Sequence, residues 1–241
     1  MTRAAGQGLR VRGLGFAVPA DEAGAGAPAA RRWVLRGLDL DLPAGAQAAL
    51  TGPSGSGKST LLHLLAGLAT PDEGDVCFGA DLISRWPTTR RELWRRQQVG
   101  LVFQQFHLFG ALSALDNLLL PWTFDHLRIP APARAHARDL LAQLGVREQA
   151  RCAVLSRGEQ QRVAVARALV RQPALVLADE PTASLDPAHA AEACALLQRL
   201  CERHGAALVV ATHDPSIAAR FDTRIELQPH TPTLTTAADP A

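Results

Sequence analysis

One glycine-rich segment combines a lysine with hydroxyl side chains at a spacing that suits phosphate chemistry. Residues 52–60 read G-P-S-G-S-G-K-S-T and fit the pattern G-x-x-x-x-G-K-[ST], with Gly52, Gly57, Lys58 and Ser59 at the fixed positions. Glycines let the backbone turn so that successive N–H groups point at a phosphate chain. The Lys58 ammonium would bind the outer phosphates, and the Ser59 hydroxyl is a ligand for Mg²⁺. The segment therefore predicts a phosphate-binding loop.

The residues on either side of this loop support the same interpretation. Residues 47–51 have the composition of a short strand, and residues 61–68 are apolar with helical spacing. A helix that starts at the loop would direct the positive end of its dipole at the phosphates. The alternative is a glycine-rich turn that matches the pattern by chance. Such a turn would have no reason to lie between a strand and a helix.

A pair of acidic residues ends an apolar strand later in the chain. Residues 174–178 read A-L-V-L-A, and Asp179 and Glu180 follow directly. In an open α/β sheet, ligands bind at the carboxyl ends of the strands. Asp179 could hold Mg²⁺ through water, and Glu180 could act as a general base for an attacking water. A strand that ends in solvated acids is the simpler alternative, although it is seldom found together with a phosphate loop.

A serine and a glycine begin a long helical pattern at residues 155–169, which read L-S-R-G-E-Q-Q-R-V-A-V-A-R-A-L. Ser156 is a good N-cap, so the helix start is a second possible anion site. Periodicity alone does not distinguish this from an ordinary capped helix.

The elements that must position these residues alternate along the chain. Strand patterns occur at residues 9–18, 33–42, 76–78, 99–103, 174–178 and 207–211. Helical patterns occur at residues 89–97, at 113–144 with breaks expected at Pro121, Pro130 and Pro132, at 156–171 and at 188–203. This order predicts an α/β fold with a parallel central sheet, an antiparallel N-terminal layer and an all-helical insert.

Bulk composition excludes several classes of protein. The 241 residues carry a net charge of +2, which is too balanced to indicate nucleic-acid binding. The four cysteines lie far apart in sequence, which favours buried, reduced thiols over metal ligands or disulfides. No secretory signal is evident, and no apolar run reaches the ~18 residues of a membrane span. A role at a membrane would therefore need a separate partner.

Residues 155–169 closely resemble the signature L-S-G-G-[EQ]-x-Q-R-V-A-[IV]-A-R-A-L of ABC-type ATPases. The phosphate loop, Gln104 in L-V-F-Q, the Asp179–Glu180 pair, the S-L-D triplet ending at Asp186 and the T-H-D triplet around His213 follow in that family's order. The resemblance extends from about residue 9 to residue 227. The run G-L-V-F-Q-Q-F-H-L-F is most similar to the MacB/LolD/FtsE group of ATPase subunits.

The resemblance implies a P-loop NTPase (RecA-like) core and a role for each motif. It divides a single domain into a β layer and core (about 9–90 and 165–227), a helical subdomain with the signature (about 91–164) and a disordered tail (228–241). The catalytic residues would be Glu180, His213, Gln104 and Lys58. ATP would bind to Gly52, Pro53, Ser54, Gly55, Ser56, Gly57, Lys58, Ser59, Thr60, Ser156, Gly158 and Asp186. Mg²⁺ would bind at Ser59, Gln104 and Asp179.

The family pattern also implies that the site is shared between two copies of the chain. Ser156 and Gly158 would contact the γ-phosphate of ATP held by the second copy, and Asp186 would lie at that interface. His213 follows an apolar strand, on the side where Glu180 should lie, and would hold the attacking water. A lone histidine at a strand end is otherwise most often structural, so its role depends on the other motifs.

The sequence departs from the family pattern at two places. Arg157 replaces the first glycine of the signature. The family usually stacks adenine on an aromatic residue after the first strand, but this chain has no tyrosine and Val18 aligns with that position. Phe16 and Trp33 are the other candidates for adenine stacking.

The resemblance predicts an ATPase that drives a separate transmembrane permease from the cytoplasmic face of the membrane. The cargo would be a lipoprotein, lipid, peptide or antibiotic. An FtsE-like ATPase that regulates a membrane partner is the alternative, and nucleic acid is not expected as a partner. The expected permease-docking face contains Phe106, Phe109, Leu112, Leu115 and Trp122, although these side chains could equally fill the core of the insert.

Overall fold

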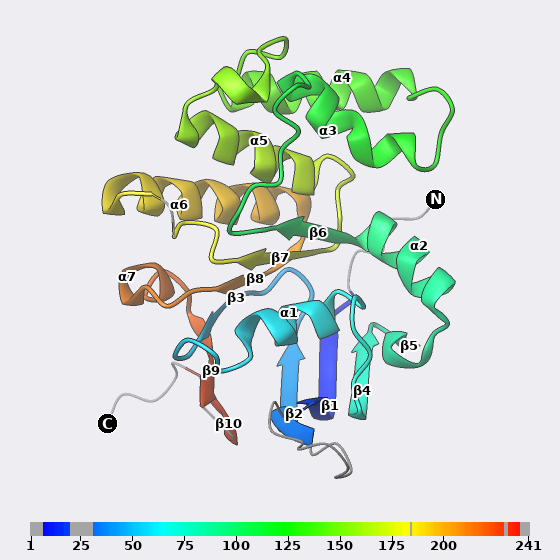
Figure 1. The fold of residues 1–241 in the computed structure, drawn as a ribbon, viewed down its shortest axis with the longest axis vertical. Coiled ribbons are helices and arrows are strands. Elements are labelled where there is room, and N and C mark those ends of the chain that lie inside the picture. Colours follow the sequence, from blue (N-terminus) through cyan, green and yellow to red (C-terminus); the bar gives the residue numbers. More distant parts are fainter. Residues whose placement is uncertain (1–6, 20–30, 184, 229–230, 237–241) are drawn as a thin grey trace, which may run out of the picture.

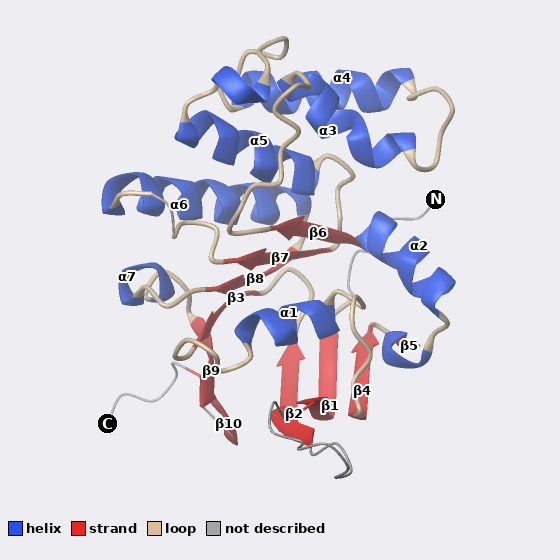
Figure 2. Cartoon of the chain, viewed as in Figure 1, coloured by secondary structure: helices blue, strands red, loops and turns tan. Residues whose placement is uncertain are grey.

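The computed structural model describes residues 7–19, 31–183, 185–228 and 231–236, with backbone alone for the last range. The described strands form two sheets (Figures 1 and 2). The first has four strands in the order β2–β1–β4–β5, and the second has six in the order β10–β9–β3–β8–β7–β6.

The four-stranded sheet is antiparallel and comes mainly from the N-terminal part of the chain. Its strands are β1 (Leu9–Pro19), β2 (Arg31–Leu42), β4 (Glu73–Phe78) and β5 (Asp81–Leu82). Alternate residues of β2 from Leu38 to Leu42 are buried, so the apolar residues share one face while Asp39 and Asp41 lie on the other. This confirms the predicted antiparallel N-terminal layer.

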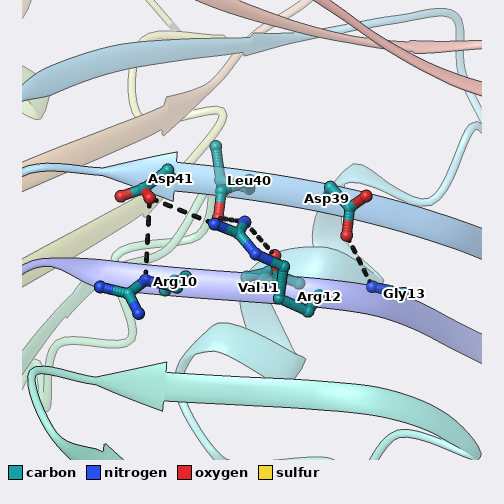
Figure 3. A network of polar contacts seen from close by, with 7 residues as sticks. All are labelled: Arg10, Val11, Arg12, Gly13, Asp39, Leu40 and Asp41. Carbon is teal, nitrogen blue, oxygen red and sulfur yellow. Dashed lines mark hydrogen bonds and ion pairs between the residues drawn. The ribbon is translucent and has the colours of Figure 1, made fainter.

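A polar network crosses the exposed face of the β1–β2 pair (Figure 3). The Asp41 carboxylate lies 3.3 Å from Arg12 Nη2 and 3.7 Å from Arg10 Nε, and the Gly13 N–H donates to Asp39 Oδ1 over 2.7 Å. Gly13 has φ of 56° and sits where the strand register shifts. Exposed ion pairs contribute about 0–1 kcal/mol each, so the network adds little to the stability that the buried face provides.

The second sheet is parallel except for its last strand. Parallel pairing joins β3 (Gln47–Thr51), β6 (Val99–Val102), β7 (Leu175–Asp179), β8 (Ala207–Ala211) and β9 (Thr223–Gln228). Both faces are covered, as expected for a parallel sheet. In β7, Leu175 and Leu177 belong to one hydrophobic core, whereas Val176 and Ala178 belong to a second core on the opposite face.

Helices cover the two faces of this sheet (Figure 1). Helix α1 (Lys58–Leu65) packs on the face that the antiparallel layer shares, and α5 (Arg157–Leu169) and α6 (Pro187–His204) pack on the other. Helix α6 ends at Gly205, which has φ of 64° and a left-handed conformation. The remaining short elements are α7 (Pro215–Ala218) and the 3-10 turns η1 (Ile83–Arg85) and η2 (Cys152–Val154).

The helical region lies beyond α6 and the edge strand β6 (Figure 1). Helices α3 (Ala114–Thr123) and α4 (Ala131–Gln143) pack with α5. The expected helix break at Pro121 was wrong, because Pro121 lies inside α3, near its end. The break at Pro130 is confirmed, because Pro130 is the N-cap of α4. The break expected at Pro132 was wrong, because Pro132 lies in the first turn of α4, where a missing N–H costs little. The predicted subdomain boundaries near residues 91 and 165 fall inside α2 (Thr88–Gln98) and α5.

The C-terminal part of the described chain also differs from expectation. A disordered tail was expected from residue 228, but Thr231–Thr236 form strand β10, which pairs antiparallel with β9. Threonine favours strands, and Pro232 is tolerated because β10 is an edge strand. No helix of the described residues combines the length and apolar character needed to cross a membrane.

Candidate nucleotide-binding site

The candidate site lies where neighbouring strands of the parallel sheet end. Strands β3, β8, β7 and β6 are adjacent, and their carboxyl ends share one edge. The glycine-rich loop follows β3, His213 follows β8, Glu180 follows β7 and Gln104 follows β6. Motifs that are far apart in the sequence are therefore gathered because the strands are parallel and in this order.

The backbone of the loop requires glycine at its start. Gly52 has φ of 146°, and a Cβ there would lie 2.4 Å from the Leu227 carbonyl oxygen and 2.7 Å from Ser56 Oγ. Any side chain would force the loop away from β9. The pattern therefore has glycine at position 52 for two reasons: the backbone needs a positive φ there, and the packing against Leu227 leaves no room for a Cβ.

The Lys58 ammonium sits inside the curl of the loop. It donates hydrogen bonds to the carbonyl oxygens of Gly52 at 2.8 Å and Pro53 at 3.1 Å. Lys58 is the first residue of α1 and is buried. Ser56 Oγ is also buried and lacks a hydrogen-bond partner in the described part of the chain. An amino group with a third N–H and an unpaired hydroxyl are donors suited to phosphate oxygens.

A cavity of about 620 Å³ brings most of the predicted site residues together. From the loop and the start of α1 it is lined by Ser54, Gly55, Gly57, Lys58, Ser59 and Thr60. From the other strand ends it is lined by Gln104, Asp179, Glu180 and His213. Gly52 and Pro53 line the adjoining cavity beside Thr212 and His213.

Glu180 and His213 are in direct contact across the β7–β8 edge. His213 Nδ1 lies 2.9 Å from Glu180 Oε1, and the Glu180 N–H donates to the Ala211 carbonyl over 2.9 Å. Glu180 has φ of 46°, a conformation that costs energy for a residue with a side chain. The histidine side chain is 67% exposed, whereas that of Glu180 is 14% exposed.

Ser156 is fully engaged in capping α5. Its hydroxyl accepts a hydrogen bond from the Glu159 N–H, and the Glu159 carboxylate accepts from the Ser156 N–H at 2.8 Å. Hydrogen bonds from the Ser156 hydroxyl and N–H hold the pKa of Glu159 below its usual value. The sequence anticipated the cap residue, and the structure adds the reciprocal bond.

The other residues of the signature side lie apart from the cavity. Gly158 lines a separate hollow of about 430 Å³ between α5 and α6. Asp186 caps α6 by accepting from the His189 N–H, and its carboxylate lies 2.5 Å from His189 Nδ1. That contact lowers the pKa of Asp186 and raises the pKa of His189. Three residues of the signature side do not line the phosphate-loop cavity: Ser156, Gly158 and Asp186.

Arg157, which stands in place of the first signature glycine, contacts its own chain. Its guanidinium carbon lies 5.1 Å from the ring centroid of Phe106, just after Gln104 in the sequence. Arg167, further along α5, donates to the carbonyl oxygens of Phe106 and His107, each at 2.7 Å. Two arginines of α5 therefore hold the segment that follows Gln104.

Strands β1 and β2 contribute Val18, Arg32 and Val34 to the lining of the cavity. Of the three candidates for adenine stacking, Val18 lines the cavity and the other two do not. Phe16 packs against the core, and Trp33 fills the space beside Gly15, where a Cβ would meet its ring at 2.9 Å. The sequence interpretation did not single out Arg32 or Val34, although strand alternation places them on one face of β2.

The expected docking residues are mostly internal. Phe106 and Leu115 are buried, and Trp122 packs against the helical core with Arg171 over its ring at 4.7 Å. Phe109 is 56% exposed. The alternative that these residues fill the core of the insert therefore holds for most of them.

A family model described as ABC transporter matches residues 35–183. The chain belongs to the ABC transporter family. It is 44% identical over 197 residues to the lipoprotein-releasing system ATP-binding protein LolD of Cereibacter sphaeroides, covering 81% of this chain and 88% of the relative. The LolD of Psychrobacter arcticus is 42% identical over 197 residues, covering 81% of this chain and 87% of the relative.

Solved structures of ABC cassettes have the same fold. A dimeric ATP-binding cassette in a post-hydrolysis state, bound to ADP and Pi, superposes with a TM-score of 0.81 at 30% identity, covering 96% of this chain and 99% of that chain. A dimeric structure of a bacterial ABC transporter cassette gives a TM-score of 0.82 at 30% identity. The match covers 96% of this chain and 99% of that chain. The chain is thus an ATP-binding subunit of an ABC transporter in the LolD/MacB-like group, and its activity is ATP hydrolysis.

Proposed function

We propose that two copies of this ATPase subunit enclose two ATP molecules and that the closure drives a separate lipoprotein-handling permease. The observation that carries this proposal is the division of the site within one copy. The phosphate-loop cavity contains Lys58, Gln104 and Glu180, whereas Ser156 and Asp186 lie outside it. Each copy would supply the signature residues to the nucleotide bound by its partner.

Within each composite site, the residues have distinct roles. Residues 52–60 wrap the phosphates, and Lys58 exchanges its bonds with the loop carbonyls for bonds to phosphate oxygens. Glu180 polarises the attacking water, and His213 positions it beside the γ-phosphate. Hydrolysis removes the γ-phosphate contacts to Ser156 and Gly158, which lets the two copies separate.

Mg²⁺ suits the oxygen donors that line the cavity. Ser59, Gln104 and Asp179 supply a hydroxyl, an amide and a carboxylate oxygen there, the hard ligands that Mg²⁺ prefers. In the described residues, no cluster of three or more His, Cys, Asp or Glu side chains could hold a metal on its own. The ion would therefore bind together with ATP, and it would neutralise charge that develops on the phosphates.

The proposed permease partner would place this subunit at the cytoplasmic face of the membrane. Support for a lipoprotein cargo comes from the similarity to LolD proteins. The test is to purify the chain with its membrane partner, reconstitute both in vesicles that carry a triacylated lipoprotein, and measure lipoprotein release. Release that depends on ATP and is lost in Lys58→Ala supports the proposal. ATP hydrolysis without release would restrict the function to a regulatory ATPase.

A simpler test addresses the nucleotide site alone. Lys58→Ala should abolish ATP binding measured by calorimetry, because the outer phosphates lose their charged partner in a buried position. Unchanged affinity would remove Lys58 from the proposed site.

A further inference from the structure

Strands β1 and β2 contribute three described residues to the lining of the candidate ATP cavity. Val18 on β1 and Arg32 on β2 are directly opposed register partners, and Val34 lies two residues further along β2 on the same face. Val34 also reaches the phosphate loop, since a Cβ on Gly57 would lie 3.0 Å from its Cγ1. All three residues line the cavity, and Val34 lies next to the phosphate loop.

Of the three arginines on the described strand β2, Arg32 is the one whose side chain has no partner among the described residues. Its neighbour Arg31 pairs with Asp72 at 2.8 Å and donates to the Ala17 carbonyl at 2.8 Å. Arg36 lies over the Trp33 ring at 5.2 Å. The Arg32 side chain, by contrast, makes no hydrogen bond or ion pair with any described residue, and it lines the cavity.

The cavity has no Phe or Trp side chain among its described lining residues, and the sequence contains no tyrosine. A nucleotide whose phosphates lie in the loop would extend its base toward Val18, Arg32 and Val34. A guanidinium group is planar, delocalised and weakly hydrated, so it stacks well on the π face of a ring. The apolar side chains of Val18 and Val34 next to it would exclude water from the stacked pair.

We infer that Arg32 is the base-binding residue of this ATPase and that its guanidinium stacks on adenine over a platform formed by Val18 and Val34. This inference rests on the proposed ATP site. It assigns to a cation on β2 the role that was expected of an aromatic residue after β1. Arg32 is a binding residue and takes no part in the chemical step.

The test compares ATP with inorganic tripolyphosphate, which carries the phosphates without the base. Both affinities are measured by calorimetry on the full chain without Mg²⁺, so that hydrolysis does not interfere. In Arg32→Ala the ATP dissociation constant should rise about tenfold, as expected for loss of one good stacking contact, while that of tripolyphosphate should stay the same. An equal loss for both ligands would show that Arg32 acts on the phosphates and would overturn the inference.

Two further substitutions separate stacking from charge. Arg32→Lys keeps the charge but loses the planar group, so it should weaken ATP binding almost as much as Arg32→Ala. Arg32→Trp should restore ATP affinity, because an indole ring also stacks on adenine. Full ATP affinity in Arg32→Lys would contradict the stacking geometry.

Arg36→Ala is the matched control, since Arg36 is an exposed arginine of the same strand that lies over Trp33. It should change neither affinity. Failure of the wild-type chain to bind tripolyphosphate would count against the phosphate site itself. A normal tripolyphosphate affinity with no effect of Arg32→Ala on ATP would count only against the role of Arg32.

Discussion

His213 Nδ1 lies 2.9 Å from Glu180 Oε1, so the histidine and the carboxylate are hydrogen-bonded to each other in the structure. The contact joins the ends of two adjacent parallel strands, β7 and β8. Glu180 has a positive φ of 46° directly after Asp179, the last residue of β7. An attacking water that bridges the two groups would have to break this direct bond, and the histidine is sufficiently exposed to move.

Replacing Glu180 with glutamine tests the assignment of the general base. Glu180→Gln keeps the size of the side chain and a hydrogen-bond acceptor for His213, but it removes the basic carboxylate. We expect ATP binding to persist and the turnover rate to fall by about 10²–10⁴-fold, the usual contribution of a general base. The variant should accumulate as an ATP-bound dimer in size-exclusion chromatography with light scattering. Wild-type turnover would show that another group activates the water.

Substitution of Ser156 tests whether the site is shared between copies. Ser156→Arg places a long cation at the start of α5, outside the phosphate-loop cavity of its own chain. In the Glu180→Gln background we expect it to abolish the ATP-dependent dimer while the monomer still binds ATP. The lost N-cap should also lower the free energy of unfolding by about 1 kcal/mol. Ser156→Thr, which retains a capping hydroxyl, is the control and should still form the dimer. Parallel loss of dimer and monomer binding would argue for a site within one chain.

The order of strands and the residues at their ends could be predicted because they follow from local patterns. Buried runs such as residues 207–211, and polar residues directly after them, place Glu180 and His213 at one sheet edge once the strands are parallel. The Glu180–His213 bond could not be predicted, because the sequence pattern gives neither the positive φ of Glu180 nor the direction of its side chain. The helix break expected at Pro121 was also wrong, because one proline near a helix end does not outweigh the packing of α3.

The residues that line the proposed base-binding part of the cavity could not be predicted from the sequence, for a different reason. A strand pattern shows that Trp33 and Val34 face opposite ways, but it does not show which face meets the cavity. That choice depends on the pairing of β2 with β1 and on the approach of Val34 to Gly57. The sequence therefore aligned Val18 with the stacking position and kept Phe16 and Trp33 as candidates, whereas in the structure only Val18 of the three lines the cavity.

The cysteines give a prediction about pH and reactivity. Burial raises the pKa of Cys201 to about 12 and that of Cys194 to about 11, and it also raises the pKa of Cys152. Because the thiolate is the reactive form, we expect iodoacetamide to label the half-buried Cys77 first in the native protein. The other three should react only after unfolding, and Cys77→Ser should abolish native labelling.

The raised pKa values of Cys194 and Cys201 also determine how the free energy of unfolding changes with pH. The folded state favours neutral thiols, so this contribution is fully present below the ordinary thiol pKa of 9.0 and is lost as the pH rises toward the folded values. Denaturant titrations should therefore show falling stability above that pH. Rapid native labelling of Cys201 would mean that α6 opens from the sheet.

Arg157 gives the last prediction, because its side chain contacts Phe106 of its own chain where the family has glycine. Arg157→Gly should remove that stacking and lower the free energy of unfolding by about 0.5–1 kcal/mol, the usual size of an exposed cation–π contact. Phe106→Leu in combination with Arg157→Gly forms a double-mutant cycle, and the stability losses should be less than additive. We expect the ATP-dependent dimer to form with nearly unchanged affinity, measured by light scattering across a concentration series. A large change in dimer affinity with additive stability losses would show that Arg157 reaches across to the nucleotide of the partner copy.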